Sequence, residues 1–115
     1  MGTAAILFAL AAFGGAVMVA MRLGGKDLPP TALAVGHGVI AAAGLVTLIA
    51  AVKGGAVPAL ANVALAGFVL AALGGAGLFF LYHMKHRALP MPLMLVHGTV
   101  AVLSFAVLLI AVFSS

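Results

Sequence analysis

Two histidines, His37 and His97, have the strongest potential for chemistry in this chain, because they occupy one position of an internal repeat. At an offset of 60 residues, about sixteen positions between Ala4 and Val52 are identical to their partners. The matches include two glycine pairs, a proline and a His-Gly dipeptide, namely Gly14-Gly15 with Gly74-Gly75, Pro30 with Pro90, and His37-Gly38 with His97-Gly98. An internal repeat in an apolar chain predicts two equivalent structural units. The two histidines are therefore expected to face each other across a pseudo-symmetry axis, as a pair of imidazole ligands.

Four apolar stretches must position these histidines. The chain is 67% hydrophobic, with a mean hydropathy of +1.44. Each stretch reaches the ~20 residues that cross ~30 Å of hydrocarbon as a helix, the structure that satisfies its own backbone in lipid. We therefore expect an all-α fold, a single four-helix transmembrane domain over residues 1–115, built from tandem two-helix repeats at 1–55 and 61–115. The predicted helices cover about residues 3–22, 30–52, 57–83 and 90–113.

The charged residues predict how the bundle lies in the membrane. Each repeat holds two helices, so the repeats share one orientation and the pseudo-two-fold axis runs along the membrane normal. Lys53 is alone in the second loop, whereas four basic residues lie in or beside the first and third loops: Arg22, Lys26, Lys85 and Arg87. The positive-inside rule places those two loops in the cytoplasm and both termini outside. We expect a multi-pass protein of a bacterial cytoplasmic (inner) membrane.

The depth of the histidines indicates a cofactor. His37 and His97 each lie seven residues after a proline that opens a helix, about 10 Å below the membrane boundary. A histidine at that depth is costly and by default marks function. Small residues on the same or neighbouring helices would make room for a flat ring: Gly15, Gly75, Gly38 and Gly98. This pattern predicts that His37 and His97 ligate one b-type haem, with Arg22 and Arg87 near its propionates.

Other interpretations of the histidines and glycines stay open. Each histidine could instead form a structural hydrogen bond between helices, for instance to Ser104 or Thr47. The glycines could serve ordinary small-residue packing of membrane helices. A chlorophyll-type pigment held by histidine is a third interpretation.

The end of the third helix has no counterpart in the first repeat. Tyr82, His83 and His86 cluster there with Lys85 and Arg87. The cluster fits a polar helix end with an interfacial tyrosine. It also fits a quinone head-group pocket, a proton-exchange site or a docking patch for an acidic redox partner.

The residues that are missing exclude several functions. The chain has no cysteine, which excludes disulfides, iron–sulfur clusters and covalent haem attachment. Its one acid, Asp27, lies in a loop, so no membrane-embedded carboxylate is available for coupled transport. No nucleophile–base constellation is present, which favours an electron-transfer protein or subunit over an independent enzyme. Five basic residues at membrane edges form no stripe for nucleic acid, so the expected surroundings are the lipid bilayer and membrane partners.

Glycines on the first and third helices, with histidines on the second and fourth, resemble the haem-binding four-helix core of membrane b-type cytochromes, including the cytochrome b of quinol-oxidising complexes. The resemblance covers nearly the whole chain and rests on this pattern. It implies one bis-histidine haem b per chain, and a redox partner subunit or a quinone. Ligand helices in that family commonly carry two histidines each, so one on each helix implies a single-haem version. The alternative is a cofactor-free structural or assembly subunit of a larger membrane complex.

Overall fold

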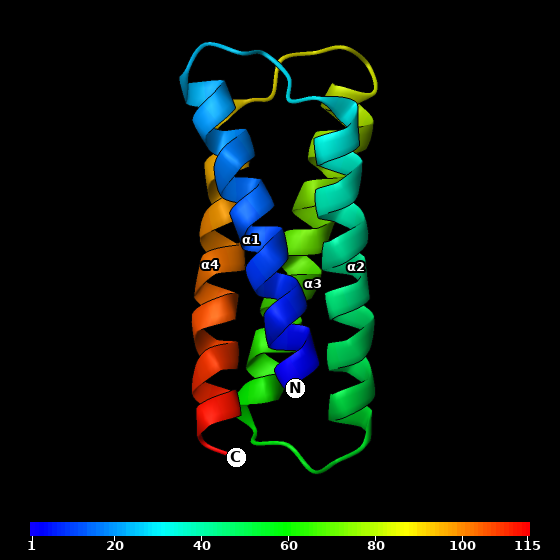
Figure 1. Cartoon of the computed structure of the whole chain (residues 1–115), viewed down its shortest axis with the longest axis vertical. Helices are drawn as coiled ribbons and strands as arrows, with labels where there is room; N and C mark the ends of the chain where they lie inside the picture. The colour runs from blue at the N-terminus through cyan, green and yellow to red at the C-terminus, as the bar shows by residue number, and fades with distance from the viewer.

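The computed structural model describes residues 1–115 as four helices joined by short loops (Figure 1). The helices are α1 (Gly2–Leu23), α2 (Thr31–Lys53), α3 (Leu60–Gly77) with its π-helical continuation η1 (Leu78–His83), and α4 (Met91–Phe113). The chain forms no strand, and the predicted all-α fold is confirmed. Four spans are long and apolar enough to cross a membrane, with α3 and η1 together forming one of them.

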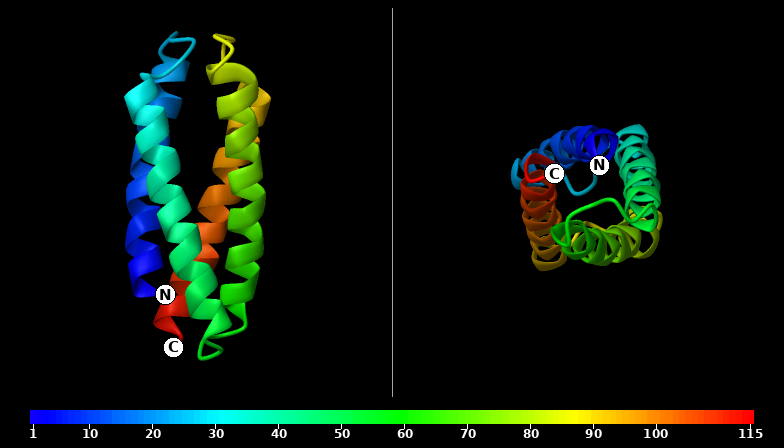
Figure 2. Two further views of the ribbon diagram at one scale, coloured as in Figure 1. Left: turned by 90° about the vertical axis from the view of Figure 1, so that its right-hand side faces the viewer. Right: turned by 90° about the horizontal axis from the view of Figure 1, so that it is seen from below.

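The helices form an elongated square bundle of 43 × 19 × 18 Å. Viewed along its axis, α1 lies diagonally opposite α3, and α2 lies diagonally opposite α4 (Figure 2). The closest packing is within each repeat, α1 against α2 and α3 against α4. The two hairpins run in the same direction, with both chain ends and the loop at 54–59 at one end of the bundle (Figure 1).

The interior repeats the sequence symmetry. Phe8 and Phe68, which are 60 residues apart, stack across the bundle axis with ring centroids 3.6 Å apart and planes 2° apart. Leu48 and Leu108, also equivalent, are both fully buried. Residues related by the repeat therefore meet at the axis, and the half of the bundle near the chain ends is filled by apolar side chains.

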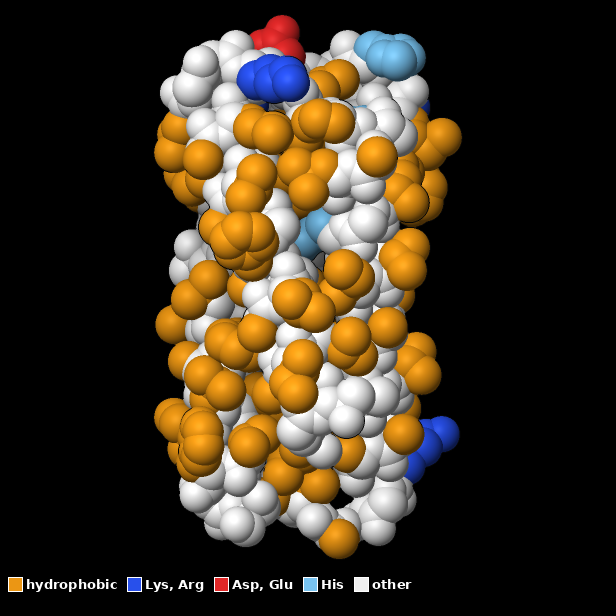
Figure 3. Space-filling view, in the orientation of Figure 1, with side chains coloured by type: hydrophobic (Ala, Val, Ile, Leu, Met, Phe, Trp, Pro, Cys, Tyr) orange, Lys and Arg blue, Asp and Glu red, His pale blue; other side chains and the backbone are white.

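The outside of the bundle is apolar as well. Large hydrophobic side chains on every helix are exposed, among them Phe13, Val46, Leu73 and Val102, and they cover much of the face in Figure 3. Seven of the 18 buried residues are alanine, and such small side chains let the helices approach closely. An apolar exterior over a small-residue interior is the pattern of a bundle surrounded by lipid.

The third span differs from the single helix predicted over residues 57–83. Its α-helix begins at Leu60, because Pro58 lies in a preceding turn where its carbonyl accepts the Ala61 N–H at 2.9 Å. Its last part, η1, is π-helical, and the Met84 N–H reaches back five residues to the Phe79 carbonyl at 2.8 Å. The corresponding residues 18–23 are ordinary α-helix. The repeats diverge here.

The loops at 24–30 and 84–90 meet at the opposite end from the termini, which we call the rim. The Leu89 N–H donates to the Asp27 carbonyl at 3.2 Å. Arg22 Nε donates to the Leu89 carbonyl at 3.1 Å. These bonds join the two repeats at the rim.

Candidate functional site

The structure brings His37 and His97 together. They lie on the diagonally opposite helices α2 and α4, and their ring centroids are 6.3 Å apart with planes at 80°. Both side chains are half-buried, and a small patch of histidine is visible part-way along the face in Figure 3, between apolar side chains. The pair lies on the rim side of the Phe8–Phe68 stack, because each histidine follows the start of its helix by two turns.

Each imidazole is held by a backbone carbonyl of the neighbouring helix. His37 Nδ1 lies 2.8 Å from the Ala11 carbonyl oxygen, and His97 Nδ1 lies 2.7 Å from that of Ala71. A carbonyl can only accept, so Nδ1 carries the proton and donates it. The Nε2 of each neutral imidazole then keeps a free lone pair, the form in which histidine binds a metal.

The predicted hydrogen bonds from these histidines to Ser104 or Thr47 do not form. Ser104 Oγ donates to the carbonyl of Val100, and Thr47 Oγ1 to the carbonyls of Ala43 and Gly44. Both hydroxyls are thus satisfied within their own helices, as serine and threonine often are in helix interiors. The bond between helices exists, but its acceptor is a main-chain oxygen.

Four glycines pack directly on the histidines. A Cβ at Gly15 would lie 3.2 Å from His37 Cε1, and one at Gly75 would lie 3.0 Å from His97 Cε1. At Gly14 and Gly74 the nearest histidine atoms would be 3.8 Å and 3.6 Å away. The sequence pattern assigned this space to a cofactor ring, but in the structure the glycines admit the imidazole itself. Without a side chain there, the ring lies against the backbone and reaches the carbonyl one turn earlier.

Gly38 and Gly98, predicted to give room beside the ligands, do not face the pair. A Cβ at either position would meet no atom within 4 Å. The reason is helical geometry, because residues next to each other in a helix point about 100° apart. With the histidines directed inward, the following glycines turn away from them.

The donor set fits a haem better than a bare metal ion. The chain has no group of three or more His, Cys, Asp or Glu side chains that could hold a metal ion. Two ligands are sufficient only if the cofactor supplies the others, as a porphyrin does.

The two main hollows of the molecule lie elsewhere. One is a shallow depression on α4 lined by Leu95, Val96, Thr99 and Val100, and the other is a pocket at the rim. A flat cofactor between His37 and His97 therefore requires neighbouring side chains or helices to move apart.

Most of the predicted rim residues have contacts of their own. The Arg87 guanidinium lies over the Tyr82 ring, 4.7 Å from its centroid, and Arg22 is bonded to the Leu89 carbonyl. His86 is exposed and adopts a left-handed backbone conformation, with φ 53°. These residues lie together at the rim, where the sequence placed them.

His83 departs from the interpretation of a polar helix end, because its side chain is buried at 7% exposure. Its Nε2 lies 3.1 Å from Thr31 Oγ1, and its ring is stacked on Phe79 at 5.3 Å and 16°. Its Nδ1 is buried and has no hydrogen-bond partner. The sequence signal for burial was the apolar run Leu78–Leu81 just before it, with Phe79 one turn away on the same face.

No protein-family model, curated protein or solved structure matches this chain. The features that indicate a function are the histidine pair on α2 and α4 and the buried His83 at the rim.

Proposed function

We propose that this chain is a membrane b-type cytochrome that carries electrons through one haem b, alone or as a subunit of a redox complex. The observation that carries the proposal is the histidine pair, whose ring centroids lie 6.3 Å apart while a carbonyl of the neighbouring helix bonds to Nδ1 of each ring and leaves Nε2 as the nitrogen that would bind iron. A bound haem would supply one-electron redox chemistry. His37 and His97 would hold it through their imidazoles.

The protein's own residues would tune such a site in three ways. The carbonyls of Ala11 and Ala71 fix the ring orientation and make each ligand nitrogen more basic. The apolar surroundings and the cations at the rim, Arg22 and Arg87, would both disfavour the positive charge of a ferric haem centre and so favour its reduced form. Phe8 and Phe68 fill the axis in the other half of the bundle, which supports a single-haem version.

The orientation in the membrane is part of the proposal. Arg22, Lys26, Lys85 and Arg87 lie at the rim end, so the positive-inside rule places the rim in the cytoplasm and both termini outside. The histidines are nearer to the rim than to the termini. A redox partner subunit or a quinone would then exchange electrons at the rim side of a bacterial inner membrane.

The second candidate is a cofactor-free structural or assembly subunit. The contacts between glycines and histidines favour it, because they already satisfy each imidazole through its neighbouring helix. The largely apolar exterior would suit packing against other membrane subunits equally well.

The absorption spectrum of the protein purified from haem-replete cells separates the two candidates. We expect a Soret band, sharp reduced α and β bands, and one haem per chain. His37→Ala and His97→Ala should each lose haem or convert it to a high-spin form. Thr99→Ala, an exposed position on the same helix as His97, is the matched control and should keep the spectrum.

Loss of haem in these variants must be distinguished from loss of fold. Added free imidazole should restore the low-spin spectrum of His97→Gly if that position supplies a ligand. A wild-type protein that is helical, monodisperse and colourless would overturn the proposal and favour the cofactor-free subunit.

A further inference from the structure

A buried imidazole nitrogen without a partner needs an explanation. His83 Nδ1 lies in a side chain that is only 7% exposed, and nothing bonds to it. Leaving a buried polar atom unpaired is costly, and nearly all such atoms in folded proteins are paired. A ligand bound beside His83 would supply the hydrogen bond that Nδ1 lacks.

The neighbour of His83 makes that nitrogen adaptable. Thr31 Oγ1 contacts the other ring nitrogen, Nε2, at 3.1 Å, and a hydroxyl can either donate or accept. If Nε2 donates to Thr31, Nδ1 has a lone pair and accepts a hydroxyl. If Thr31 donates, Nδ1 carries the proton and binds a carbonyl. The pair can therefore recognise an oxygen in either its hydroxyl or its carbonyl form.

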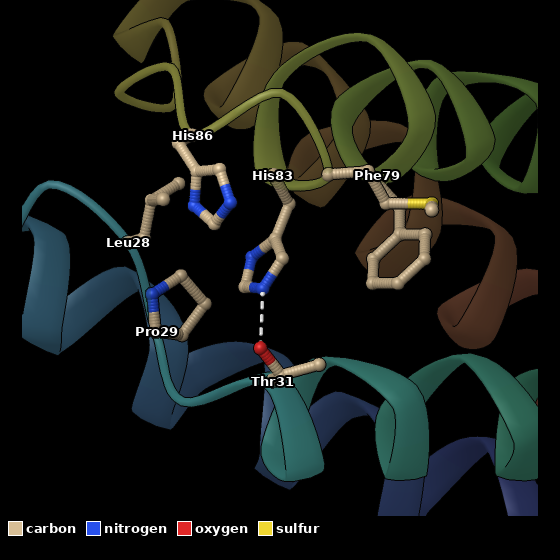
Figure 4. A pocket seen from close by; sticks show the side chains of 7 residues that line it. Leu28, Pro29, Thr31, Phe79, His83 and His86 are labelled. Carbon is tan, nitrogen blue, oxygen red and sulfur yellow. Dashed lines mark hydrogen bonds between the residues drawn. The ribbon is translucent and has the colours of Figure 1, made fainter.

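The space around His83 suits a planar apolar ring. The pocket has a volume of about 270 Å³ and is lined by Leu28, Pro29, Thr31, Phe79, His83, Met84 and His86. Figure 4 shows the free nitrogen of His83 directed toward Leu28, Pro29 and His86, away from Thr31. Apolar walls with a few convergent polar atoms are typical of small-molecule sites.

The pocket is asymmetric. The position equivalent to His83 in the first repeat is Leu23, which is exposed and lies at the end of an ordinary α-helix. Only the second repeat has the π-helix that carries Phe79 and His83, and such segments often occur at functional sites. The pocket lies beside the loop at 24–30, at the edge of the apolar span, where a lipid-soluble molecule would enter.

We infer that this pocket binds the head group of a quinone or hydroquinone through His83 Nδ1, with His86 at its mouth. The inference rests on the proposed function for its redox role, since it names the electron partner of the haem, but binding itself requires no haem. A ring oxygen would pair with Nδ1, and the apolar ring would lie among Leu28, Pro29 and Phe79.

The test compares two ligands of one shape. Duroquinone is tetramethylbenzoquinone, and durene is the same tetramethylated ring without oxygens. We expect duroquinone to bind the detergent-solubilised protein at least tenfold more tightly than durene, the worth of one hydrogen bond to a buried polar atom. It should also shift the ¹⁵N resonance of His83 Nδ1, whereas durene should not.

Variants separate the hydrogen bond from the shape of the pocket. His83→Phe keeps a ring that can stack on Phe79 and should remove the preference for duroquinone over durene. Thr99→Val, an exposed position on α4 that does not line the pocket, should keep it. Equal affinities for the two ligands in wild type, or an unmoved Nδ1 resonance, would overturn the inference without recourse to a variant.

The same measurements in the double variant His37→Ala, His97→Ala keep the two proposals distinguishable. Duroquinone binding should persist there, because the pocket does not include either histidine. A colourless wild-type protein that binds duroquinone would refute the proposed cytochrome function and support the quinone pocket. A wild-type protein that contains haem but does not bind duroquinone would support the cytochrome function and refute the pocket.

Discussion

Replacing Gly75 with alanine tests whether the glycines exist to seat the histidines. The new Cβ would lie 3.0 Å from His97 Cε1, so the ring must retreat by at least 0.4 Å to reach the 3.4 Å of an ordinary contact. The ring is held by a 2.7 Å bond from Nδ1 to the Ala71 carbonyl, and moving it away weakens that bond. Gly74→Ala is the matched control, because its Cβ would lie 3.6 Å from the same histidine.

The difference in stability between Gly75→Ala and Gly74→Ala comes from the one contribution that they do not share. Both gain about 0.5–1 kcal/mol from replacing glycine inside a helix. Only Gly75→Ala also incurs about 1–3 kcal/mol of overpacking, part of which is the strained hydrogen bond. We therefore expect Gly75→Ala to be less stable than Gly74→Ala by roughly 1–3 kcal/mol. Gly15→Ala, at 3.2 Å, should fall between them.

The assay is unfolding in detergent micelles, followed by circular dichroism, for the three alanine variants and wild type. The ¹⁵N shift of His97 Nδ1 reports the hydrogen bond separately. If Gly75→Ala and Gly74→Ala are equally stable and the shift is unchanged, the glycine contacts do not hold the histidine, and the reasoning is refuted.

Two further predictions concern the core and the ligand planes. Gly67→Ala would place a Cβ on Ser104 Oγ and should lower the free energy of unfolding by about 1–3 kcal/mol. Adding Ser104→Gly should recover most of that loss, because the equivalent position in the first repeat is already a glycine, Gly44. Additive effects in the double variant would contradict this contact. If a haem is held with the imidazole planes near the observed 80°, its ferric form should give a strongly anisotropic low-spin EPR signal. The reason is that perpendicular imidazoles interact almost equally with two iron d orbitals. A rhombic signal, which is typical of parallel planes, would show that the pair is arranged differently.

The repeat explains why so much of the fold was accessible from the sequence. Lengths of apolar sequence define the spans, and the common offset predicts that His37 and His97 approach each other, as they do. The same offset relates Phe8 to Phe68, and their stack could have been predicted by the same reasoning. Symmetry decides which residues meet at an axis, whatever their chemistry.

Other features depend on packing that the pattern does not contain. The carbonyl partners of the histidines are backbone atoms of another helix, so no residue type signals them. The close contact of Gly75 with His97 depends on how tightly α3 approaches α4. The burial of His83 depends on the π-helix, a local change in hydrogen bonding within an uninterrupted apolar run. Each of these features depends on a shift of about an ångström or on a single hydrogen bond, and the spacing of residue types in a sequence does not specify such detail.

The two histidine sites have complementary symmetry, and this bears on how the protein could work. A pair related by a two-fold axis offers the same chemistry from both sides, so it can hold an electron carrier but cannot by itself distinguish donor from acceptor. That distinction requires a feature present in only one repeat. The His83 pocket is such a feature, since its π-helix and its unpaired nitrogen have no counterpart near Leu23. On the same span, the pocket residues Phe79 and His83 follow Gly75, the glycine that seats His97, by only four and eight residues. A symmetric carrier with one asymmetric entrance is the simplest arrangement by which these repeats could direct electrons.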